Sequence, residues 1–291
     1  MMKKIFFFFG ITCCLFSVSC NNSGKNTFDT NDSIVDSSNL VKSEVVFQVP
    51  SPDAFIFMLK SSKATFDASI VLPQNQTYTE PYKQKLILGV YAADMAYLST
   101  FNKFQETVKY FSKVKSLSDQ LGLTTAIDKQ TFDRLEKNIT NADSISFITD
   151  NSFYNIIDHL QQNDDGYTLS LITIGGWVES MHIACQLAGK YDEKNPIVQR
   201  IASQKPVLNN IIEMLKKKQS QPQISNFLTA FENLKSLMDK ITEKRENADV
   251  AKNVKTKIVI GAKTFYSFDQ DTFNQFKDEI EKLRNEITKT V

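Results

Sequence analysis

The sequence predicts an all-α protein, a single bundle of about 8–9 helices with two fully apolar helices at its centre. Three observations predict this class. The 291-residue chain has only 9 Gly and 7 Pro, fewer than a turn-rich β-sandwich would need. Its apolar residues recur at intervals of three and four, which is the period of an amphipathic helix. Two further stretches have no polar face, and a helix that is apolar on all sides is buried.

The first helices can be placed from their end signals. Ser51 suits the N-cap and Pro52 the first position of a short apolar helix over 54–60. A loop then leads to the first central helix at about 80–102. A clear apolar stripe predicts the next helix at about 104–121, and Gly122 is a good residue to end it.

The two central helices are predicted at about 80–102 and 167–189. The second contains Gly175-Gly176, which costs roughly 1 kcal/mol per Gly relative to Ala. Close contact with a neighbouring backbone would explain why this cost is tolerated. The first has a face of small residues where such a neighbour can approach: Gly89, Ala92, Ala93 and Ala96.

The remaining helices follow from apolar spacing and from proline. Amphipathic helices are expected at 128–139 and from Asp143 or Ser144 to about Gln162. Pro196 opens a helix to about Lys218, kinked at Pro206, and Pro222 opens another to about Glu246. The segment 257–261 is expected to be extended, as a segment that crosses the bundle would be, and Asp271 is expected to cap a last helix.

The first twenty residues have the features of a secretion signal. Lys3 and Lys4 precede an apolar stretch, 5–16, that is too short to span a bilayer. Ser17-Val18-Ser19-Cys20 resembles the lipobox of bacterial lipoproteins, although the commonest form has Leu where Ser17 stands. The resemblance implies that the peptide is cleaved before Cys20, that the thiol is diacylated and that the new amine is acylated. Ordinary signal cleavage nearby, with no role for Cys20, is the alternative.

This signal fixes the expected division of the chain: a lipoprotein signal peptide at 1–19, a flexible tether at 20–48 and a helical domain at 49–291. The tether is rich in Asn, Ser, Thr and Asp, which cannot bury enough apolar surface to fold. It would reach about 30 Å. Cleavage and lipidation leave Cys185 as the one remaining thiol, so no disulfide within the domain is expected.

The charge balance excludes one class of partner. Removal of residues 1–19 leaves 32 basic against 33 acidic side chains. A nucleic-acid-binding protein needs a basic face that releases counterions, so we expect no nucleic-acid partner.

Two carboxylates stand out, because Asp94 and Glu179 each lie inside a central helix that is otherwise apolar. A buried, unpaired charge would cost several kcal/mol, so each must be paired, protonated or placed at a wet cleft. One interpretation is a polar core network, in which Tyr91, Tyr97 or a Lys serves Asp94, and Ser180, Trp177 or a helix end serves Glu179. The other is a ligand pocket between the central helices, formed by these same side chains. Structural networks often place carboxylates in cores, which favours the first interpretation.

Glu179 and His182 form a Glu-x-x-His, the spacing found in di-iron helical bundles. Such bundles need a second Glu-x-x-His, but the only other histidine, His159, has Ile156 three residues before it. We therefore predict no metal site and no cofactor. The sequence also lacks a Walker loop, a Gly-x-Gly-x-x-Gly and a Gly-x-Ser-x-Gly elbow.

Several ordered segments together resemble a family of uncharacterised all-helical Bacteroidota lipoproteins of unassigned function. The segments are 49–52 (VPSP), 88–97 (LGVYAADMAY), 116–122 (SLSDQLG) and 175–179 (GGWVE). The family has Gly where Ala93 stands and an aromatic residue where His182 stands, and the second difference counts against a metal-binding role for His182. The resemblance implies an all-α fold and an envelope location, and no mechanism.

The sequence thus predicts a membrane-anchored envelope lipoprotein of the outer membrane, facing the periplasm or the cell surface. We expect a non-catalytic binding or scaffold module whose partner is the membrane, through its lipid, with another envelope protein as a candidate second partner. The alternative is small-molecule binding or an enzymatic pocket at Asp94 and Glu179. The sequence does not predict the oligomeric state.

Overall fold

The computed structural model describes residues 51–60, 62, 64–127, 129–138, 141–246 and 263–290. Its helices are α1 (Pro52–Lys60), α2 (Pro81–Thr100), α3 (Phe104–Gln120), α4 (Lys129–Lys137), α5 (Ala142–Gln162), α6 (Gly166–Ala188), α7 (Pro196–Ala202), α8 (Lys205–Lys216), α9 (Pro222–Met238) and α10 (Gln270–Thr288). Strands β1 (Thr242–Glu246) and β2 (Lys263–Ser267) form one antiparallel pair, with Glu243 opposite Tyr266. The all-α prediction is confirmed. The predicted signal peptide, Cys20 and the tether lie outside the described residues.

Helices α2 and α6 form the centre of the domain, as their all-round apolar sequences predict. They cross so closely that side chains are excluded from the contact. A Cβ added at Gly175 would lie 1.9 Å from the carbonyl oxygen of Leu86, and one at Gly89 would lie 2.1 Å from that of Ile172. Glycine is thus required on both sides of the crossing, which confirms the reason expected for Gly175-Gly176.

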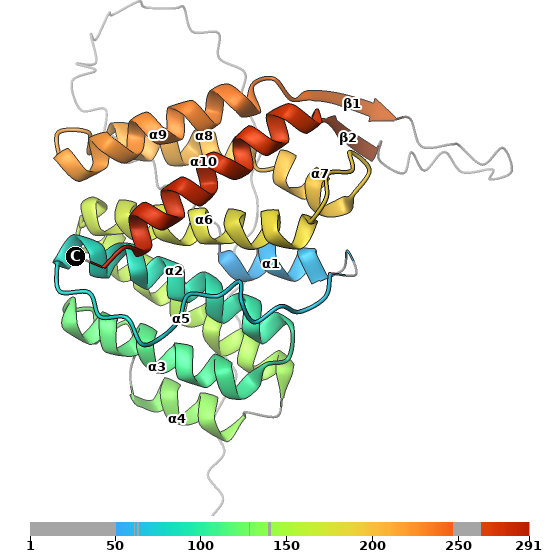
Figure 1. Ribbon diagram of the computed structural model, residues 1–291. Helices are drawn as coiled ribbons and strands as arrows, with labels where there is room; N and C mark the ends of the chain where they lie inside the picture. Colours follow the sequence, from blue (N-terminus) through green and yellow to red (C-terminus); the bar gives the residue numbers. More distant parts are fainter. Residues whose placement is uncertain are drawn as a thin grey trace, which may run out of the picture. The chain divides into compact units, whose positions relative to one another are not determined.

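The other helices cover this pair on two sides (Figure 1). Helices α3, α4 and α5 lie on one side, and α8, α9 and α10 lie on the other. Most amphipathic helices bury the stripe expected from sequence; in α10 it includes Phe273, Phe276, Ile280, Leu283 and Ile287.

Residues 64–80, which precede α2, have no regular secondary structure but are an integral part of the domain. We call residues 64–80 the strap, because this segment runs across the bundle before entering α2 (Figure 1). Ile70 and Leu72 are buried, so the strap contributes side chains to the core. Its backbone, which makes no helical hydrogen bonds, must find partners elsewhere.

Further sequence predictions for the second half of the chain differ from the structure or fall outside it. The predicted helix 196–218 is two helices, because the chain turns at Ser203 and Gln204 and Pro206 occupies the first turn of α8. The predicted helix 222–246 ends at Met238, and its last residues form β1 instead. Asp269, rather than Asp271, caps α10 by accepting from the Thr272 backbone N–H. The extended segment 257–261 lies outside the described residues.

Among the helices of the described ranges, none combines the length and the apolarity that a transmembrane span requires.

Candidate functional site

Glu179, in the middle of α6, is paired with an arginine from the C-terminal helix. The Glu179 side chain has no exposed surface. Arg284 of α10 donates from Nε to Oε2 at 2.8 Å and to Oε1 at 3.1 Å, and from Nη2 to Oε1 at 3.0 Å. Charge-assisted contacts made with two nitrogens are the strongest form of ion pair. Glu179 is therefore an ionised carboxylate whose charge is neutralised inside the domain.

Arg284 also contacts the strap. Its Nη2 donates to the carbonyl oxygen of Ile70 at 3.1 Å. One guanidinium thus joins α10, α6 and the strap, and only 13% of its side chain is exposed.

Asp94, on α2, completes this network and is also fully buried. Its Oδ2 accepts a hydrogen bond from the backbone N–H of Leu72 at 3.0 Å. Burial, and then the negative charge of Glu179, raise the pKa of Asp94 well above its usual value, although Leu72 N–H and Arg284 oppose them. As a carboxylate, Asp94 would leave Oδ1 without a donor. As a carboxylic acid, it can donate to the adjacent Glu179, so we assign it the protonated state.

The resulting chain of contacts runs from Leu72 through Asp94 and Glu179 to Arg284 and on to Ile70. It begins and ends on the strap backbone. General acid–base catalysis requires a carboxyl group within hydrogen-bond reach of a substrate. Because both carboxyl groups have no exposed surface, this arrangement favours the polar-network interpretation over the ligand pocket.

The candidate tyrosines also hold the strap. Tyr97 Oη accepts from Asp67 N at 2.8 Å and donates to Asp67 O at 3.2 Å. Tyr91 Oη donates to Pro73 O at 3.4 Å, and its ring packs edge-on against Tyr110. Tyr110 in turn donates to Leu72 O at 2.7 Å. Burial raises the pKa of Tyr91 and Tyr110, so both hydroxyls remain donors.

His182, three residues after Glu179, contacts α10. Its Nδ1 lies 2.9 Å from Oε2 of Glu281, three residues before Arg284. Burial lowers the pKa of His182, although Glu179 and Glu281 oppose the shift. Nδ1–H of the neutral ring can therefore donate to Glu281. The Glu-x-x-His spacing thus matches a complementary pair on α10, and no cluster of three or more His, Cys, Asp or Glu in the described ranges could hold a metal.

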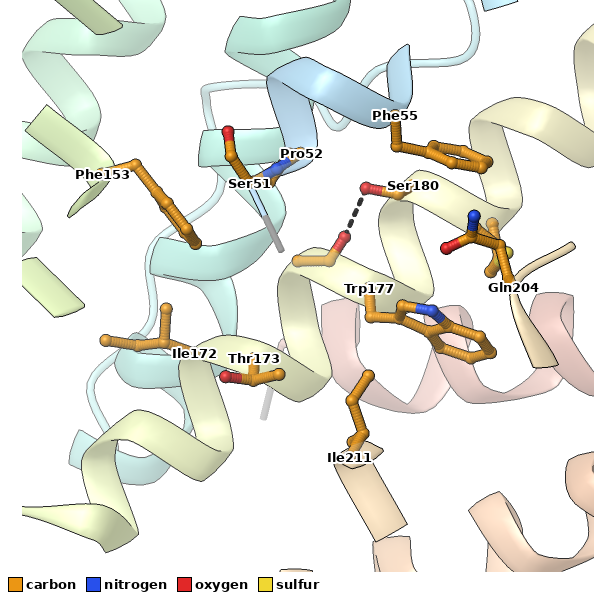
Figure 2. Close-up of a pocket in the computed structure, with 12 residues that line it drawn as sticks. Ser51, Pro52, Phe55, Phe153, Ile172, Thr173, Trp177, Ser180, Gln204 and Ile211 are labelled. Carbon is orange, nitrogen blue, oxygen red and sulfur yellow. Dashed lines mark hydrogen bonds between the residues drawn. The ribbon is translucent and has the colours of Figure 1, made fainter. Parts of the chain in front are cut away.

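Trp177 lies apart from this network, beside a small cavity between α6, the start of α1, α5 and the α7–α8 turn (Figure 2). The indole packs against Phe231, and its Nε1–H finds no hydrogen-bond partner among the described residues. Ser180 and Gln204 also line the cavity. The cavity volume is about 30 Å³, whereas small-molecule sites usually measure about 300–1,000 Å³. Side chains would have to move before a ligand could enter.

Cys185, the cysteine within the described ranges, is also unsuited to nucleophilic chemistry. Cys185 is buried in α6, and burial raises its pKa to about 12. The thiolate, which is the nucleophilic form, is therefore not populated near neutral pH.

Sequence reasoning identified the two carboxylates but not their partners. Arg284, Tyr110 and the Leu72 backbone complete the network, and they come from α10, α3 and the strap. One signal was available for Arg284, which follows Leu283 of the apolar stripe on α10 and thus lies at the edge of the buried face. No feature of the neighbouring sequence distinguishes Tyr110 from the other buried residues of α3.

The fold and these contacts characterise a domain with an internal ionic network, and the residues that the structure describes form no recognisable catalytic set. No protein-family model, curated protein or solved structure matches the chain.

Proposed function

We propose that the mature chain is a lipid-anchored envelope protein that acts as a non-catalytic binding or scaffold module. The observation that carries the proposal is the enclosure of Asp94 and Glu179, the strongest acid–base candidates in the sequence. Both are fully buried, and each bonds to a partner from another part of the domain. Groups used in this way stabilise the fold, which leaves the surface and the anchor for function.

The anchoring part of the proposal rests on the signal sequence that ends at Cys20. Three acyl chains would hold the protein far more firmly than a single chain, which binds only marginally. A Cys20→Ser variant should lose incorporation of labelled palmitate and should leave the membrane fraction. Cys185→Ser is the matched control and should retain both. Equal labelling of the parent and Cys20→Ser would refute lipidation at Cys20.

The binding part of the proposal is supported by large aromatic side chains on the surface. Phe57 on α1 is 66% exposed and Phe147 on α5 is 62% exposed. Aromatic residues are enriched at protein–protein interfaces and frequently dominate their energy. We place the partner contact on the face of α5 that carries Phe147.

Site-specific photo-crosslinking in intact envelopes tests this surface. A photoreactive amino acid at position 147 should give one discrete adduct, and the adduct should disappear in the Cys20→Ser background. The same amino acid at Lys109, which is exposed on α3, should give none. Absence of an adduct at position 147, or equal adducts at both positions, would refute the proposed surface.

The alternative, a small-molecule or enzymatic pocket at Asp94 and Glu179, would require these carboxyl groups to open to solvent. The ion pair with Arg284 and the hydrogen bond from Leu72 oppose such opening. A ligand that protects the domain against unfolding in the parent but not in Asp94→Asn would support the alternative over our proposal.

A further inference from the structure

A second surface feature lies between α7 and β2, where the chain forms an open groove of about 510 Å³. This volume falls within the range of small-molecule sites. Its polar lining groups come from Lys194, Gln199, Arg200, Ser203, Thr264 and Tyr266. Among the described residues, the lining includes two cations and no carboxylate.

Arg200 is the unusual member of this set. Its Nε is buried and has no hydrogen-bond acceptor, and no ion pair involves its guanidinium within the described ranges. Burial lowers the pKa of Arg200, but an arginine side chain does not lose its proton in proteins. Among the described residues, this partly buried cation therefore has no counter-charge.

Two acids of the adjoining segments make contacts with residues other than Arg200. Glu193 accepts a hydrogen bond from the Ser267 hydroxyl at 2.7 Å. Asp239 pairs with Lys205 at 3.0 Å and also with Lys235. Glu243, which lies opposite Tyr266 in the strand pair, is not among the lining residues.

The walls of the groove are held in place by hydrogen bonds between α7 and β2. The Gln199 side chain donates to Tyr266 O and accepts from Tyr266 N, both at 2.7 Å. The same amide nitrogen donates to Glu193 O at 2.7 Å. A guanidinium in a preorganised groove loses less conformational freedom when a ligand binds.

We propose that the groove between α7 and β2 binds a small anionic molecule through its carboxylate or phosphate group. Arg200 makes the two-pronged contact with the anion, because the planar guanidinium matches the spacing of oxygens in both groups. Lys194 supplies a second positive charge, and Phe265 and Tyr266 provide an aromatic wall for the rest of the molecule. This site is separate from the partner surface proposed at Phe147, and neither proposal depends on the other.

Calorimetric titration of the mature, non-lipidated Cys20→Ser protein tests the site with two probes. Phenyl phosphate and benzoate carry the same ring on different anions, so their relative affinities distinguish the phosphate and carboxylate classes. We expect saturable, 1:1 binding of at least one probe. Arg200→Gln should weaken that binding at least tenfold. Arg200→Lys should weaken it less, because lysine keeps the positive charge but lacks the planar set of N–H donors of the guanidinium.

Arg134→Gln, which removes an exposed arginine from α4, is the control for net charge and should bind like the parent. The melting temperature of each variant is also measured without ligand. Arg200→Gln should melt at or above the parent temperature, since it removes an uncompensated cation. Absence of saturable binding of both probes, equal binding by Arg200→Gln, or equal weakening by Arg134→Gln would overturn the proposal.

Discussion

Replacement of Arg284 by methionine tests whether the buried network stabilises the fold. Methionine retains much of the length of the side chain but removes the three contacts to Glu179 and the contact to Ile70. Glu179, with no exposed surface, would then be a buried carboxylate without a cation. Breaking one side of a buried ion pair typically costs about 3–5 kcal/mol. Domains are stable by only about 5–15 kcal/mol, so this loss is a large part of the total.

Urea unfolding of the Cys20→Ser protein, followed by circular dichroism, measures this loss. We expect Arg284→Met to lower the free energy of unfolding by about 3–5 kcal/mol. Lys282→Met on the same helix is the matched control. It removes only an exposed contact of 3.7 Å to Glu279, so its cost should stay below about 1 kcal/mol.

The double variant Glu179→Met/Arg284→Met identifies the cause of the loss. If the cost of Arg284→Met arises from an uncompensated carboxylate, removal of that carboxylate should recover part of the stability. If Arg284→Met unfolds at the same urea concentration as Lys282→Met, the network does not hold the domain together. If the double variant is no more stable than Arg284→Met, the cost arises from packing rather than from charge.

Three further predictions concern the same region. The folded-state pKa of Asp94 is raised above that of the unfolded chain, so its contribution to stability is present below about pH 4 and is lost as the pH rises, by at most about 1.4 kcal/mol per pH unit. Asp94→Asn imitates the protonated state, so its stability relative to the parent should increase as the pH rises above about 4 in urea unfolding; a difference that does not change with pH would contradict protonation. Gly175→Ala places a Cβ 1.9 Å from the backbone oxygen of Leu86 and should lower the free energy of unfolding by about 1–3 kcal/mol. Gly166→Ala is its control: the new Cβ meets only the flexible end of a lysine side chain, so the melting temperature should change little. Tyr110→Phe removes a hydroxyl donor from a strap carbonyl and should cost about 1 kcal/mol in urea unfolding, with no change in stability as the contrary result.

The central helices could be predicted because their signals are local. A stretch such as 86–98, apolar in every direction, has no stable place except the interior. The cost of Gly175-Gly176 likewise indicated a close backbone contact before any partner was known. In both cases one segment of sequence carried enough information to identify its environment.

The strand pair and the split of the predicted helix 196–218 depended on information outside the segments concerned. Residues 242–246 (TEKRE) are mostly good helix formers, and nothing in them indicates pairing with residues 263–267. Tertiary context overrides such weak preferences. Pro206 signalled an interruption, but a kink and a break have the same local signature, and the turn at Ser203 and Gln204 decides between them.

The partners of the two carboxylates are also distant in sequence, and the geometry of the helix crossing explains why they are needed. Glycine brings α2 and α6 into backbone contact, and Asp94 and Glu179 are fully buried beside this crossing. Water therefore cannot solvate their charges. Protonation removes one charge, and a cation must arrive from elsewhere to balance the other. Arg284 comes from 105 residues beyond Glu179, and it also bonds to the strap carbonyl of Ile70 from 214 residues away. The central crossing therefore becomes electrostatically stable only when α10 and the strap have both docked, which ties the two ends of the domain into one cooperative unit.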